Sequence, residues 1–128
     1  MDLETSPYNS TCVTEVCVET FWAGTGSVVQ DIALGIAPNA PVQRFSIPLM
    51  SEESVGAQSF SKVGLLWTTA PTIPTNFFRR VSGGVVTGGK FCIWTFPRGL
   101  IVAASASMVL WQIGTGVNNI IGGWAIDE

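Results

Sequence analysis

The sequence predicts an all-β protein, an antiparallel β-sandwich of jelly-roll-like form with at most one short helix. Short apolar runs alternate with polar residues, and glycine- or proline-containing turn signals recur about every ten residues. Length supports the same view, because 128 residues fit one domain with a sizeable core. We expect a polar N-terminal arm over residues 1–10, followed by a single sandwich domain over residues 11–128.

The N-terminal half contains four expected strands and one segment that fits either a helix or a loop. In residues 11–23 the side chains alternate between a more apolar and a more polar set. The even positions from Cys12 to Trp22 should therefore be buried, and the odd positions, which include Glu15 and Glu19, should be more exposed to solvent. Residues 28–36 and 42–49 should pair with each other, and Pro48 indicates a sheet edge. Residues 50–57 fit either a short helix or a charged loop. Residues 59–68 form the next expected strand, before a proline-containing loop over residues 69–76.

The C-terminal half is expected to be a series of short strands separated by tight turns. Residues 77–86 form a strand interrupted by two glycines. Four further strands are expected over residues 90–96, 100–103, 108–113 and 120–127, with turns at residues 97–99 and 105–107. The apolar surface of this last series predicts that another subunit covers at least one of its faces.

Charged residues are scarce in this chain. The few basic residues argue against a nucleic-acid partner, and the length of the apolar runs argues against a membrane partner. Asp, Glu, Lys and Arg make up 12%, against roughly 25% in an ordinary soluble domain. Six basic residues and a net charge of −3 do not suit a nucleic-acid partner. The longest weakly polar run, residues 99–111, is shorter than the roughly 20 residues of a spanning helix, so we expect no membrane partner. The N-terminus lacks the pattern of a signal peptide, which predicts synthesis in the cytoplasm without export.

No combination of residues indicates catalysis, a cofactor or a metal. The absence of histidine excludes Ser-His-Asp and Cys-His arrangements and most zinc sites. Cys12 and Cys17 are five residues apart on one expected strand, so they should point to opposite faces, and Cys92 is a third reduced thiol. Glu15 and Glu19 should share a face, with backbones about 13 Å apart, which is wider than a glycosidase pair needs. We therefore predict a non-enzymatic protein with no catalytic, cofactor or metal residues.

Five tryptophans leave two interpretations open. On one sheet face, Trp22, Trp67, Trp94, Trp111 and Trp124 would form a sugar-stacking platform. Each is flanked by alternating apolar residues, which favours the core or a subunit interface. A carbohydrate- or receptor-binding module is therefore the alternative function.

The C-terminal segment resembles small β-sandwich virion proteins of tailed bacteriophages. The resemblance is carried by the Phe96-Pro97-Arg98-Gly99-Leu100 turn, the Ser105-Ala106-Ser107 turn before an apolar strand ending at Trp111, and the closing Gly122-Gly123-Trp124 strand. It covers about 40 residues and consists of turn chemistry and strand pattern. It implies a capsid decoration or head/tail-associated structural subunit, made in the host cytoplasm and located in the virion. The partners of such a subunit would be further copies of the same chain, in a homo-oligomer with a trimer favoured, and other virion proteins such as the major capsid protein. On the same resemblance, the alternative carbohydrate- or receptor-binding module would belong to a phage fibre.

Overall fold

A computed structural model of the chain describes residues 1–21, 28–38, 42–50, 58–86, 90–113 and 119–127. Every element in these ranges is a strand: β1 Asp2–Glu4, β2 Thr11–Phe21, β3 Val28–Ile36, β4 Val42–Met50, β5 Gln58–Thr69, β6 Arg79–Val86, β7 Lys90–Val102, β8 Ser107–Gln112 and β9 Asn119–Asp127. The all-β prediction is therefore confirmed. Most of residues 50–57, the segment expected to be a helix or a loop, lies outside the described residues.

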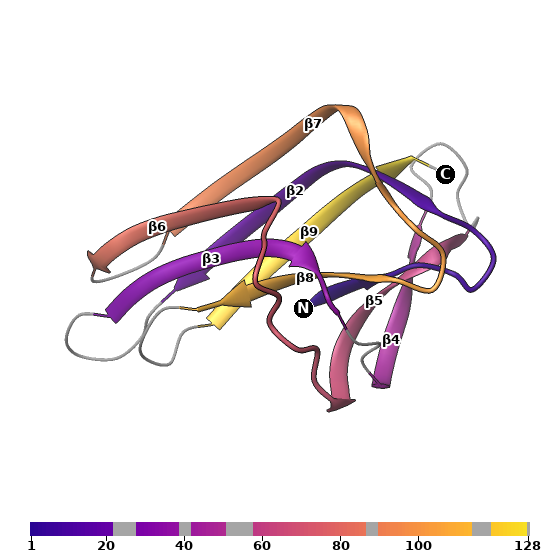
Figure 1. Cartoon of the computed structure of the whole chain (residues 1–128), viewed down its shortest axis with the longest axis horizontal. Coiled ribbons are helices and arrows are strands. Elements are labelled where there is room, and N and C mark those ends of the chain that lie inside the picture. The colour runs from indigo at the N-terminus through magenta and orange to yellow at the C-terminus, as the bar shows by residue number, and fades with distance from the viewer. Residues whose placement is uncertain (22–27, 39–41, 51–57, 87–89, 114–118, 128) are drawn as a thin grey trace.

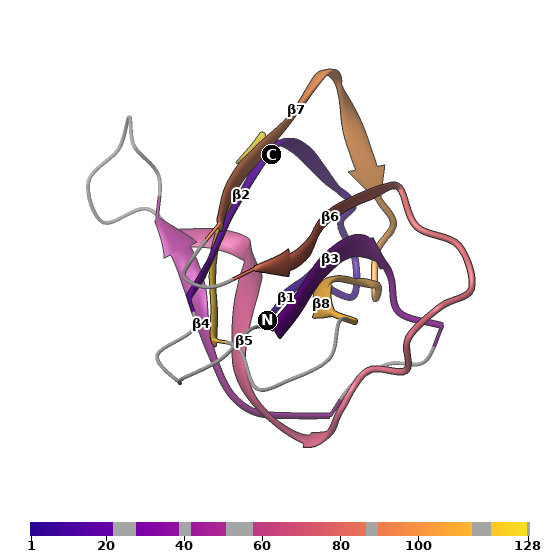
Figure 2. The same ribbon diagram turned by 90° about the vertical axis from the view of Figure 1, so that its left-hand side faces the viewer.

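The strands form two antiparallel sheets that face each other as a sandwich. The larger sheet has the order β4-β5-β1-β8-β3-β6, and the smaller has the order β7-β2-β9. Figures 1 and 2 show the two layers, with β2 and β7 in one and β3, β6 and β8 in the other. In Figure 1, β4 and β5 run steeply across the direction of β3, so the larger sheet turns strongly along its length.

The pairing of the first eight strands is nested, as in a jelly roll. β4 pairs with β5, β3 with β6, β2 with β7 and β1 with β8. This pattern arises when one long antiparallel ribbon is rolled into two facing sheets. Two additions modify it: β9 pairs with the free side of β2, and β5 also pairs with β1. The second pairing places β4 and β5 at the end of the larger sheet.

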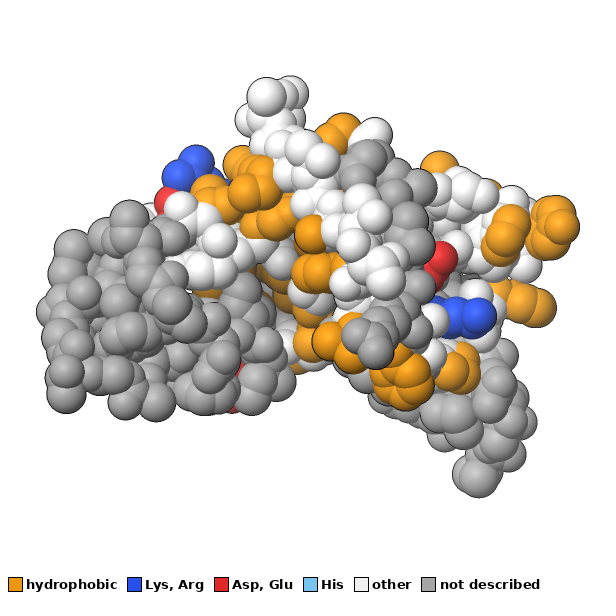
Figure 3. Space-filling model, turned by 90° about the horizontal axis from the view of Figure 1, so that it is seen from below, with side chains coloured by type: hydrophobic (Ala, Val, Ile, Leu, Met, Phe, Trp, Pro, Cys, Tyr) orange, Lys and Arg blue, Asp and Glu red, His pale blue; other side chains and the backbone are white. Residues whose placement is uncertain are grey.

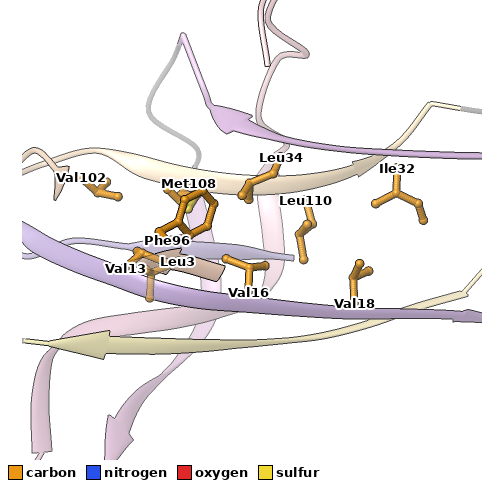
Figure 4. Close-up of a cluster of buried hydrophobic side chains, with 10 residues drawn as sticks. All are labelled: Leu3, Val13, Val16, Val18, Ile32, Leu34, Phe96, Val102, Met108 and Leu110. Carbon is orange, nitrogen blue, oxygen red and sulfur yellow. The ribbon is translucent and has the colours of Figure 1, made fainter. Parts of the chain in front are cut away.

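The core lies between the two sheets and is almost entirely aliphatic. Its fully or nearly buried members come from β1, β2, β3, β7 and β8 and are Leu3, Val13, Val16, Val18, Ile32, Leu34, Phe96, Val102, Met108 and Leu110 (Figure 4). The sheets approach closely at Gly122, where an added β-carbon would lie 2.8 Å from Leu110 Cδ1. β-Branched residues suit the strands because their side chains pack well on a pleated surface.

Three expectations about strand pairing and ends are wrong. The strand of residues 28–36 does not pair with the strand of residues 42–49, because β3 lies between β8 and β6 while β4 pairs with β5. Residues 97–99, expected to form a turn between two strands, lie inside the single strand β7, although its register with β2 jumps from Thr95 to Leu100 there. The C-terminal strands also do not form a hairpin series, since β8 belongs to the larger sheet and β7 and β9 flank β2 in the smaller one. The edge position expected from Pro48 is confirmed, because β4 is the terminal strand of its sheet.

The expectation of a loose N-terminal arm is wrong for residues 2–4. These residues form β1, which lies inside the larger sheet between β5 and β8, and Leu3 is fully buried. Beyond β1, backbone and side-chain hydrogen bonds between Thr5 and Ala106 hold the N-terminal segment to the residues just before β8. Residues 7–10 are exposed.

Candidate interaction surface

The outer face of the smaller sheet carries a row of exposed apolar side chains. Phe91, Ile93 and Ile101 are 64%, 47% and 65% exposed. All three belong to β7. Phe91 and Ile93 alternate with Cys92 and Trp94, and Ile101, which lies beyond the register jump of β7, alternates with Leu100 and Val102. These four alternating residues belong to the core or pack against it. We call the outer side of β7, β2 and β9 the small-sheet face. β7 is also the terminal strand of this sheet, so the apolar row borders an edge that can accept a further strand.

Acidic side chains lie on the same face. Glu15 pairs across the strands with Thr95, and Glu19 pairs with Phe91. Both alternate with the buried residues Val16 and Val18, so the expectation that the two carboxylates share a face is confirmed. The two carboxylates are four residues apart along β2. Because β2 lies between β7 and β9, Glu15 and Glu19 lie between the apolar side chains of β7 and the strand β9. The face thus combines exposed apolar side chains with two carboxylates whose backbones, four residues apart on one strand, are about 13 Å apart, which is wider than a glycosidase pair needs.

A bulge in β2 reverses the expected directions of its side chains before Glu15, whereas Val16, Val18 and Thr20 are buried as expected. Between Val13 and Glu15 the register with β9 shifts by one residue, which leaves Thr14 as the extra residue. The buried positions therefore change from odd, at Thr11 and Val13, to even, from Val16 onward.

The same bulge places two thiols on one face. Cys12 and Cys17 each lie between buried neighbours and so point outward together, although the spacing of five residues predicted opposite faces. A β-carbon at Gly99 would overlap Cys12 Sγ, and one at Gly123 would lie 2.9 Å from Cys17 Sγ. Both thiols thus pack over glycines of the neighbouring strands. Gly99 additionally has a φ of 69°, which a side chain disfavours.

Cys92 lies on the opposite, inward side of β7 and packs against the core. Burial raises the pKa of its thiol, because an apolar environment disfavours the thiolate. All three cysteines are free, consistent with the reduced state expected from the sequence.

The described tryptophans do not make an exposed platform. Trp111 is buried in the larger sheet and meets Phe77 edge to face, with ring centroids 6.0 Å apart. Trp94 and Trp124 are half-buried and pack against the core. Trp67 is also half-buried, and its Nε1 donates to Asp2 Oδ1 at 3.0 Å. Trp22 lies outside the described residues. The described four therefore occupy the structural positions that the alternating pattern favoured.

A second apolar area lies at the far end of the larger sheet. Phe45 of β4 and Leu66 of β5 are exposed cross-strand partners, and Phe60 of β5 is 65% exposed. On the face drawn in Figure 3, hydrophobic side chains reach the surface in several places and charged ones at few points. The sequence pattern did not predict this area, because alternation alone assigns apolar residues to the core. It does not show that the smaller sheet has only three strands facing the six of the larger sheet.

The ion pair of Asp31 with Arg80 is structural. Arg80 Nε donates to Asp31 Oδ1 at 2.9 Å, and its Nη2 donates to Oδ2. The hydrogen-bonded guanidinium lowers the pKa of Asp31. Because Asp31 and Arg80 lie on the adjacent strands β3 and β6, the pair secures the outermost strand of the larger sheet.

Within the described ranges no group of three or more Cys, Asp or Glu residues is arranged to hold a metal ion. No helix there is long and apolar enough to cross a membrane. Comparison with protein families, curated proteins and solved structures found no match. The small-sheet face is therefore the candidate site, on geometry alone.

Proposed function

We propose that this chain is a non-enzymatic structural subunit of a virus particle, a capsid decoration or head/tail-associated protein. It would bind its own copies, as a trimer, and a neighbouring virion protein such as the major capsid protein. The observation that carries the proposal is the exposed apolar row of Phe91, Ile93 and Ile101 on the small-sheet face. The C-terminal resemblance described above supplies the virion class.

Apolar area of this kind favours association. Contiguous exposed apolar patches mark interaction sites in soluble proteins, and phenylalanine is enriched where interfaces are fully buried. Burying such side chains stabilises a complex by roughly 25 cal/mol for each Å² removed from water. The carboxylates of Glu15 and Glu19 on the same face would fix the register of the partner.

The nested strand pairing is compatible with this class. Jelly rolls build many viral capsid proteins, and lectins as well. Because a fold hosts many functions, the surface carries the proposal and the topology only supports it. The lectin-like alternative has less support, since none of the described tryptophans forms an exposed stacking surface.

Two matched substitutions test the role of the small-sheet face. Phe91→Lys changes a residue of that face, and Phe60→Lys changes a residue of the same type and nearly the same exposure, 64% against 65%, on β5 of the other sheet. We expect light scattering to give a defined oligomer for the wild type and for Phe60→Lys. Phe91→Lys should dissociate because the interface would have to bury a charge. Dissociation by Phe60→Lys alone would refute the assignment of the face.

Association with particles is tested separately. Particles purified on a density gradient from the organism that carries the gene should contain peptides of this chain, as detected by mass spectrometry. Recovery of the chain only in fractions without particles would contradict a virion role.

A further inference from the structure

β1 holds together two parts of the larger sheet although it is only three residues long. Its register pairs Asp2, Leu3 and Glu4 with Gly64, Val63 and Lys62 of β5 on one side and with Val109, Met108 and Ser107 of β8 on the other. In the described sheet β1 therefore joins the β4–β5 pair to β8, β3 and β6. The space between β5 and β8 is a slot for one short extended segment.

The slot makes specific contacts with that segment. The Leu3 side chain enters the core and is fully buried. Asp2 Oδ1 accepts a hydrogen bond from Trp67 Nε1 at 3.0 Å. Thr5 Oγ1 donates to Ala103 O at 2.7 Å, and the Ala106 N–H donates to Thr5 Oγ1 at 3.0 Å. An acid, a central apolar residue and a hydroxyl are thus recognised at three defined positions.

The connection from β1 to β2 is suited to opening. Residues 7–10 are exposed, and Tyr8 is 91% exposed. The turn is closed locally by Ser6 Oγ, which accepts from the Tyr8 N–H at 3.1 Å and from the Asn9 N–H at 2.8 Å. If residues 6–10 were extended, they would span roughly 17 Å at strand rise. Besides the contacts of β1 and Thr5, opening this turn breaks these two hydrogen bonds and the one that the Ser105 N–H donates to Ser6 O at 2.9 Å.

We propose that the slot between β5 and β8 is a strand-acceptor site that, in the assembled protein, is filled by β1 of a second copy. The inference rests on the proposed self-assembly and names its mechanism. The partners of β1 lie in β5 and β8, far away in sequence, so β1 of a neighbour makes the same contacts as the chain's own β1. Exchange of an identical segment is a low-cost route to an oligomer, and backbone pairing with an added strand supplies affinity.

Two variants of the full-length chain, each with one added cysteine beside the three native ones, report the exchange. Glu4 and Lys62 are direct cross-strand partners, and Cβ atoms in such pairs lie about 4.5–5.5 Å apart, close to disulfide geometry. Glu4→Cys and Lys62→Cys are mixed in equal amounts, unfolded, refolded together and oxidised. The disulfide between positions 4 and 62 is then identified by peptide mass spectrometry. A mixture of Glu19→Cys with Lys62→Cys is the matched control, because Glu19 lies on the small-sheet face, and each variant alone reports bonds to the native cysteines.

We expect covalently linked pairs of chains joined between positions 4 and 62, amounting to about half of the chains in a randomly mixed exchanged trimer, and no such species in the control. The double variant Glu4→Cys/Lys62→Cys distinguishes failure of the strand exchange from failure of the proposed self-assembly. If an oligomer forms but its 4–62 disulfide lies only within single chains, strand exchange is refuted while assembly through the sheet faces stands. If the wild-type chain stays a monomer at every concentration, both proposals fail.

Discussion

Replacing Leu3 with alanine tests whether the N-terminal strand belongs to the fold. Leu3 is fully buried and lies in the core cluster with residues of both sheets. The substitution removes three carbon atoms, worth about 2.4 kcal/mol at roughly 0.8 kcal/mol for each buried group. The cavity left behind raises the cost to about 3–5 kcal/mol, a large share of the roughly 5–15 kcal/mol that stabilises a domain.

Urea unfolding followed by tryptophan fluorescence measures this loss. Tyr8→Ala is the matched control, because Tyr8 lies four residues beyond the strand and is 91% exposed. The control should change the free energy of unfolding by no more than about 0.5 kcal/mol. Equal effects of the two substitutions would show that the N-terminal segment is a loose arm and would refute the position of β1 in the sheet.

Two further predictions concern close packing and acid stability. Gly122→Ala should lower the free energy of unfolding by about 1–3 kcal/mol, because its β-carbon would lie 2.8 Å from the buried Leu110 Cδ1. Gly123→Ala should lower the free energy of unfolding by less, since only the Cys17 thiol must move. Thermal unfolding of the two variants measures the difference. An equal loss of stability would contradict the close approach of the sheets at Gly122. Arg80 lowers the pKa of Asp31, so the unfolded state takes up the proton first as the pH falls below about 3.8, and stability is lost there. Asp31→Asn should lose less stability than the wild type between pH 5 and pH 3 in urea titrations, and an unchanged loss would contradict the role of the pair.

The sequence predicted the strands well where the local pattern was regular. The bounds of β3 match the expectation, and β2 and β8 begin within one residue of it. Strand pairing was not predictable in the same way. The nested pairing joins segments far apart in sequence, whereas local patterning favours neighbours such as residues 28–36 and 42–49.

β1 was missed because three residues with one apolar side chain have no periodicity to detect. Its burial is decided by β5 and β8, which the chain reaches much later. The register of β2 was missed for a different reason. A single extra residue, Thr14, reverses the faces on either side of it, and no glycine or proline marks the bulge.

The candidate surface was only partly predictable. Low charge and high apolar content led to the expectation of a covered face in the C-terminal segment, and β7 of that segment does carry the exposed row of Phe91, Ile93 and Ile101. The sequence could not show that Glu15, Glu19, Cys12 and Cys17 lie beside this row, because that depends on the bulge and on the pairing of β2 with β7.

The most direct test of the proposed function is the native mass of the wild-type chain over a wide range of concentration, by light scattering and by mass photometry after dilution. A structural subunit that buries the small-sheet face should give a defined oligomer, with a trimer as the expected species, that persists on dilution. A single mass near 13.6 kDa at every concentration would contradict it.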